Sequence, residues 1–154
     1  MDGEKNIPVK VENSRCPEFV GHLLHRAARL VYSDFDRIFE GIEITPTQFA
    51  TLMVIEQNPG MKQSEVGDAV AIKKNNFVAL VGELEERGLI ARTIPRNDRR
   101  AYALFLTAHG NRFLEDLKER YLTHEQTLLS ALGEDECGTL VELLHRLTGN
   151  LPRA

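Results

Sequence analysis

The sequence has no tryptophan, only two cysteines and few aromatic residues, which make up 6% of its 154 residues. Cys16 and Cys137 lie far apart, and no CxxC pair occurs. We therefore expect neither a disulfide framework nor a zinc cluster of cysteines. Two ordinary free thiols are consistent with a reducing cytoplasm.

Long apolar runs are missing as well. The most apolar stretch, Phe49 to Ile55, spans seven residues, whereas a membrane-spanning helix needs about 20. Residues 1–17 are polar and charged and lack the apolar core of a signal peptide. We expect a cytoplasmic protein with no membrane partner, in which a flexible arm at 1–17 precedes one domain large enough to bury a core.

Motifs of catalysis are not found either. The sequence contains no nucleophile elbow, no HExxH, no phosphate-binding glycine loop and no evident acid–base pair. Glu83, Glu85 and Glu86 are interpreted as the solvated outer face of a helix. We expect no enzyme and no cofactor. A metal site at His22 and His25 lacks an obvious third ligand, His109 being the one candidate.

Charge is distributed unevenly along the chain, whose formal net charge is −4. Residues 61–106 carry eight Lys/Arg and six Asp/Glu, a net +2, which leaves 11 basic and 17 acidic residues, a net −6, elsewhere. A basic middle segment between acidic flanks favours binding to a polyanion.

Apolar residues at spacings of three and four predict a series of helices. Their expected ranges are 18–42, 46–57, 62–70, 73–87, 108–131 and a last helix after Gly133. Thr45, Pro46 and Gln48 form a capping-box start signal, and Thr107 is expected to cap the next long helix. Gly88 suits a left-handed helix end.

Two short β-prone segments, 89–94 and 101–106, flank a connection at 95–100 that contains the turn formers Asn97 and Asp98. Short helices followed by such a hairpin indicate a winged helix-turn-helix. The predicted fold class is mainly α with a small β-hairpin wing. The terminal helices have broad apolar faces, which we expect to bury against a second subunit.

The stretch ELEERGLIARTIPRNDRRAYALFLTAHG (83–110) is the most specific part of the chain. Its Asp98-Arg99-Arg100 and the strand ending Leu106-Thr107 resemble the wing of MarR-family transcription factors, and the similarity extends over about 18–149. The resemblance implies a bacterial or archaeal homodimer with dimerisation helices at 18–44 and 108–150 and a DNA-binding region at 45–107. It also implies that helix 73–87 enters the major groove and that hairpin 95–100 reaches the minor groove.

The candidate DNA contacts fall in three places. Cations and backbone amides at a helix start suit phosphates, and asparagine can bond an adenine edge; the helix start carries Lys73, Lys74, Asn75 and Asn76. A narrow minor groove attracts arginine, which the wing supplies as Arg96, Arg99 and Arg100, with Asp98 interpreted as a partner of one arginine. Gln63 and Ser64 are expected either to contact the DNA backbone or to cap their helix. Many relatives carry Ser or Thr in place of Asn75 and Asn76, so their operators do not predict this one.

A candidate effector site lies on the first helix. His22, His25, Arg26 and Arg29 share one side of it, which is either a solvated or dimer-facing edge or an anion site. Phe49 and Met53 are expected to contact the ring of the effector. The stretch 48–67 resembles family members that regulate the breakdown of aromatic acids, so an aromatic acid or its CoA thioester is the expected effector. The predicted function is a homodimeric repressor that binds a palindromic operator in double-stranded DNA and is released by this effector. The alternatives are a winged-helix protein–protein module and a peroxide- or metal-sensing regulator.

Overall fold

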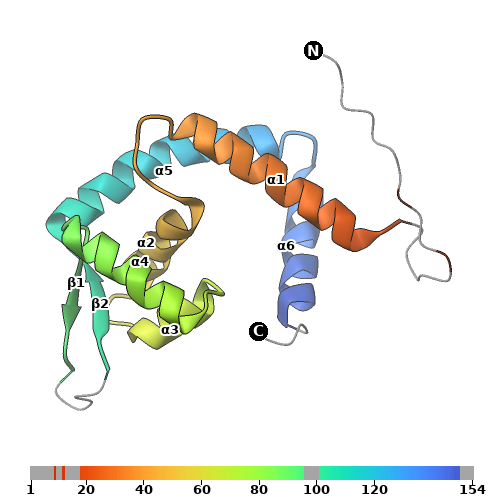
Figure 1. Cartoon of the computed structure of the whole chain (residues 1–154). Coiled ribbons are helices and arrows are strands. Elements are labelled where there is room, and N and C mark those ends of the chain that lie inside the picture. The colour runs from red at the N-terminus through yellow and green to blue at the C-terminus, as the bar shows by residue number, and fades with distance from the viewer. Residues whose placement is uncertain (1–8, 10–11, 13–17, 96–100, 150–154) are drawn as a thin grey trace.

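Figure 1 shows the computed structural model, in which residues 9, 12, 18–95 and 101–149 are described. The helices and strands are α1 (Val20–Ile38), α2 (Pro46–Gln57), α3 (Gln63–Ala69), α4 (Lys74–Glu86), β1 (Ile90–Thr93), β2 (Ala103–Leu106), α5 (Ala108–Leu128) and α6 (Glu134–Gly149). α1 and α5 pack along each other, and the elements from α2 to β2 form a lobe beside them. The predicted fold class is confirmed.

α1 ends earlier than predicted, at Ile38 rather than at residue 42. Phe35 and Phe39 are each 3% exposed and pack with Phe49 of α2. Gly41 then takes a positive φ of 80°, a conformation that glycine adopts without a steric penalty. The apolar pattern continues past the helix because residues of the turn also enter the core.

α2 begins with the predicted capping box. The Thr45 hydroxyl accepts from the Gln48 amide N–H, and the Gln48 side chain accepts from the Thr45 N–H, each at 3.1 Å. The side-chain amide of Gln48 also donates to Glu83 of α4 at 3.1 Å. One residue thus starts α2 and joins it to α4.

α3 and α4 are joined by a tight turn. Ala71 has φ 55°, and it is the one non-glycine residue with positive φ in the described part of the chain. Gly67 of α3 lies against Phe77 of α4, where an added Cβ would come within 2.9 Å of the ring. α4 ends in the predicted glycine cap, since Gly88 has φ 67° and the Leu89 N–H returns to the Leu84 carbonyl.

The hairpin pairs β1 with β2 in antiparallel register, Ile90 opposite Leu106 and Thr93 opposite Ala103. β2 is also bonded on its other edge. The Leu104 N–H donates to the Met61 carbonyl, and the Gly60 and Gln63 N–H groups donate to the Leu104 and Tyr102 carbonyls. The segment before α3 therefore holds the hairpin from the side.

α5 starts at Thr107, whose hydroxyl accepts from the Gly110 N–H at 2.9 Å, as predicted. It ends at Leu128, three residues before the predicted limit. α6 is different from all the other helices, because none of its described residues is buried. Its exposed apolar side chains are Leu140, Val141, Leu143, Leu144 and Leu147. No helix among the described residues is long and apolar enough to cross a membrane.

Candidate nucleic-acid interface

The first turn of α4 is a polar, exposed helix start. Lys73 is the N-cap residue, and Lys74, Asn75 and Asn76 form the first turn. All four residues are exposed. The free N–H groups of a helix start and its positive dipole end attract phosphate, while the two amides are free to bond base edges. The predicted placement of these residues at the helix start is confirmed.

Gln63 and Ser64 form the beginning of α3. The helix is capped by Lys62 and Glu65, since the Glu65 carboxylate accepts from the Lys62 N–H at 3.2 Å. Ser64 is exposed in the first turn. Gln63 is half-buried, and its Oε1 has no hydrogen-bond partner among the described residues. The predicted capping role therefore belongs to Lys62 and Glu65, and the role in DNA contact stays a prediction.

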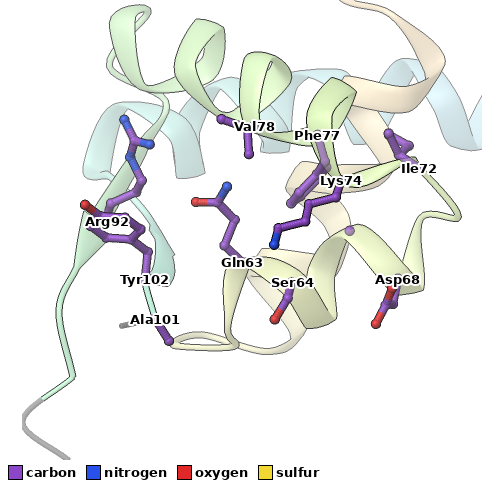
Figure 2. Close-up of a pocket in the computed structure, with 11 residues that line it drawn as sticks. Gln63, Ser64, Asp68, Ile72, Lys74, Phe77, Val78, Arg92, Ala101 and Tyr102 are labelled. Atoms are coloured by element: carbon purple, nitrogen blue, oxygen red, sulfur yellow. The ribbon is translucent and has the colours of Figure 1, made fainter. Parts of the chain in front are cut away.

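A cavity of about 430 Å³ lies between α3, α4 and the hairpin, and Figure 2 shows the residues that line it. Lys74 lies on one side of it and Arg92 with Tyr102 on the other, and Gln63 lies between them. The start of α3, the start of α4 and the hairpin thus surround one concave surface. This arrangement brings together two of the three predicted contact regions.

The third predicted region lies outside the described residues. Arg96, Asp98, Arg99 and Arg100 belong to the segment 96–100, so their placement as the tip of a wing stays a prediction. The strands that lead to this segment are described, and they adjoin α4. β1 follows the last turn of α4 (Figure 1), and Lys74 of the first turn faces the hairpin across the cavity that Arg92 and Tyr102 also line.

Sequence reasoning missed an ion pair at the base of this surface. Arg92 of β1 donates from Nε to Glu85 Oε2 of α4 at 2.9 Å and makes a second hydrogen bond to the same oxygen. The guanidinium also stacks on the Tyr102 ring, 5.4 Å from its centroid. The hydrogen bond from Arg92 lowers the pKa of the Glu85 carboxyl, and Glu85 in turn raises the pKa of Arg92.

The predicted effector residues are only partly brought together. Phe49 is 5% exposed and contacts the rings of Phe35, Phe39 and Tyr121, so it belongs to the core. Met53 is half-buried against that core. Arg29 and His25 are exposed on α1, whereas Arg26 and His22 are half-buried. Neither the cavity of Figure 2 nor a more open one of about 580 Å³ beside Glu83 and Arg87 includes any of these six residues.

A buried histidine between α1 and α5 was also missed. The His124 side chain is fully buried, and its Nδ1 lies 2.5 Å from Asp34 Oδ2 of α1. Its Nε2 has no hydrogen-bond partner among the described residues. The hydrogen bond from Arg37 lowers the pKa of the Asp34 carboxyl, burial opposes this, and His124 adds to the lowering. Asp34 and His124 thus bring α1 and α5 into contact, and the His124 ring also lies against the Tyr121 ring.

Within the described ranges, no three His, Cys, Asp or Glu side chains lie close enough together to hold a metal ion. His109 instead contacts the Phe113 ring on α5. Cys137 is a half-buried free thiol on α6, and Cys16 lies outside the described residues.

A short helical lobe, an exposed second helix of a helix-turn-helix and an adjoining β-hairpin define a winged helix-turn-helix protein. A model of the MarR family matches residues 42–101. A Thauera aromatica protein named as the transcriptional regulatory protein for the hcr operon is 34% identical over 129 residues, covering 83% of this chain and 78% of that protein. The chain belongs to the MarR family of transcriptional regulators.

Two solved structures of the transcriptional repressor CouR are also similar. The one bound to a 23-mer DNA duplex has a TM-score of 0.79 and 34% identity, covering 91% of this chain and 99% of that chain. The one bound to p-coumaroyl-CoA has a TM-score of 0.76 and 33% identity, covering 86% and 94%.

Proposed function

We propose that this protein is a homodimeric repressor that binds a palindromic DNA operator and is released by a small anionic effector. The observation that carries the proposal is the exposed start of α4, whose N-cap and first turn carry two cations and two amides and which shares a cavity with the hairpin. The similarity to a repressor bound to a DNA duplex supports the same reading. In this proposal 45–107 is the DNA-binding region, and 18–44 and 108–150 form the dimerisation region.

Dimerisation is supported by the unpaired apolar face of α6. Five of its aliphatic side chains are exposed, and so are Phe19, Val20, Leu23 and Leu24 at the start of α1. Large exposed apolar surfaces mark interaction sites in water-soluble proteins. A second copy of the chain would bury both faces and place two copies of α4 on successive turns of the duplex.

The proposed DNA binding is tested with a duplex that the wild-type protein selects from a randomised pool. Neutralised phosphates release counterions, so the logarithm of affinity should fall linearly with the logarithm of salt concentration. Footprinting should reveal two half-sites about 10 base pairs apart. A protein that selects no duplex, or that binds with no salt dependence, would be a protein–protein module instead.

Asn76→Ala should cost about 1–3 kcal/mol on the selected duplex and much less on unrelated DNA, because an amide that reads a base edge contributes to specific binding only. Fluorescence anisotropy at fixed salt measures both affinities. Gln57→Ala, which removes an exposed amide at the end of α2, is the control and should change neither. An equal loss on both duplexes would make Asn76 a positioning contact.

The effector is proposed to bind between α1 and the DNA-binding lobe. A guanidinium suits the paired oxygens of a carboxylate or phosphate, so Arg26 or Arg29, with His22 and His25 on the same side, would bind the charge. Because Phe49 is buried, Met53 offers the accessible apolar edge for an aromatic ring. A relative bound to p-coumaroyl-CoA supports an aromatic acid or its CoA thioester as effector.

Arg26→Ala and Arg29→Ala should each leave duplex affinity intact and raise the effector concentration needed for release by about tenfold, since effector and DNA oppose each other with a coupling of ~1–3 kcal/mol. The measurement is a titration of the protein–duplex complex with p-coumaroyl-CoA and with p-coumarate. Arg37→Ala, about two turns further along α1, is the control. Release of both variants at the wild-type concentration would contradict this placement.

A further inference from the structure

The side chain of Arg92 connects the hairpin to α4. Its guanidinium donates two hydrogen bonds to Glu85 in the last turn of α4 and lies over the ring of Tyr102, next to β2. We propose that Arg92 is a positioning residue for DNA binding, which fixes the hairpin relative to α4 through Glu85 and Tyr102. This role rests on the proposed DNA-binding function.

The geometry of the hairpin gives this contact its importance. Residues opposite or diagonal to each other on paired strands share a face, and Arg92 is opposite Leu104, two residues from Tyr102. Near the base of that face, Ile90 and Leu104 are buried in the core. On the side towards the segment 96–100, this face carries Arg92 and Tyr102 in place of aliphatic side chains, and these two residues line the cavity of Figure 2.

The two strands are attached differently. β2 is bonded through its backbone to the segment 60–63, and the Tyr102 carbonyl accepts from the Gln63 N–H at 2.8 Å. β1 has only β2 as a strand partner within the described ranges, so its side chains must hold it to α4. Tyr102 is thus fixed to the start of α3, and Arg92 joins Tyr102 to α4. The Arg92 guanidinium therefore sets the spacing between α3, α4 and the hairpin around the cavity.

The contacts of Arg92 argue against a phosphate ligand. Its side chain is 28% exposed, and its guanidinium is already engaged by a carboxylate and a ring. Partly exposed ion pairs contribute little to stability, so removing this one should leave the protein folded. Its loss should instead loosen the hairpin and reduce the affinity for DNA.

The test compares Glu85→Gln, Arg92→Gln and the double variant on a duplex selected by the wild-type protein. Electrostatics alone predicts that Glu85→Gln strengthens binding, because it removes a negative charge near a polyanion. The positioning role of Arg92 predicts the opposite, a duplex affinity of Glu85→Gln that is about threefold to tenfold lower. The double variant should bind the duplex no more weakly than Arg92→Gln, since both substitutions break the same contact between Glu85 and Arg92. Thermal unfolding of the variants checks that they stay folded.

Glu56→Gln is the matched control. It breaks the ion pair of Glu56 with Lys118 between α2 and α5, whose side chains are 27% and 32% exposed, close to the 36% and 28% of Glu85 and Arg92. Its duplex affinity should equal that of the wild type.

Four outcomes would overturn the proposal. Unchanged or tighter binding by Glu85→Gln, or additive losses in the double variant, would remove the positioning role. A salt slope lowered by about one unit in Arg92→Gln alone would make Arg92 a direct phosphate contact. If the wild-type protein selects no duplex, the proposed function itself fails, and this role with it.

Discussion

Gly110→Ala is expected to lower the free energy of unfolding by about 3 kcal/mol, the upper part of the range for overpacking. Gly110 is the third residue of α5, and a Cβ added there would lie 1.9 Å from the Leu89 carbonyl oxygen. That oxygen is backbone and accepts from the Thr107 N–H at 3.0 Å. It cannot move aside as a flexible side chain would, so α5 or the start of the hairpin must shift.

Urea denaturation at fixed protein concentration measures this effect. Gly82→Ala is the control, because an added Cβ in the middle of α4 meets nothing within 4 Å. Replacing a helical glycine by alanine should stabilise the protein by up to about 1 kcal/mol. A loss below about 1 kcal/mol for Gly110→Ala would mean that the close approach to Leu89 relaxes at little cost.

Leu144→Glu is expected to convert the proposed dimer into monomers and to weaken duplex binding by about 100-fold or more. Leu144 lies in the middle of the exposed apolar side chains of α6, and residues near the centre of an interface contribute most of its binding energy. A carboxylate there would be desolvated without a partner. The monomer would also lose the simultaneous contact with two half-sites.

Sedimentation equilibrium gives the mass, and anisotropy with the selected duplex gives the affinity. His145→Glu places the same carboxylate one residue later, about 100° around the helix and away from most of the apolar residues, and it should stay dimeric. Wild-type protein that sediments as a monomer would refute the dimer, whereas a dimeric Leu144→Glu would place the interface elsewhere.

Helix boundaries were predictable where short-range chemistry determines them. Thr45 with Gln48, Gly88 and Thr107 act through hydrogen bonds or dihedral angles within a few residues, and each was placed correctly. The end of α1 was wrong by four residues because Phe39 and Ile42 continue the apolar period after the helix has ended. The spacing of apolar residues indicates which residues are buried, not where a helix ends. A turn that packs on the core also buries apolar residues, so the pattern continues through it.

The candidate site divides in the same way. The cations and amides of α4 were found because they begin a helix and are exposed. Arg92 was missed because Glu85 fits equally well on a solvated helix face. Arg92 reaches Glu85 only because the turn at Gly88 brings β1 back alongside the end of α4. Asp34 and His124 lie 90 positions apart, and no local pattern pairs them. Phe49 was predicted to face a ligand, but rings from α1, from Phe39 just after α1 and from α5 surround it.

The backbone hydrogen bonds between β2 and residues 60–63 have a consequence for how such a protein changes over generations. They hold the base of the hairpin independently of the residues between Pro95 and Ala101. Lengthening a loop whose ends are already fixed adds only a small entropic cost, about 0.6 kcal/mol for each doubling of length. Substitutions and insertions in that stretch can therefore accumulate without unfolding the lobe. Under the proposed function, DNA preference would then change while the scaffold is preserved.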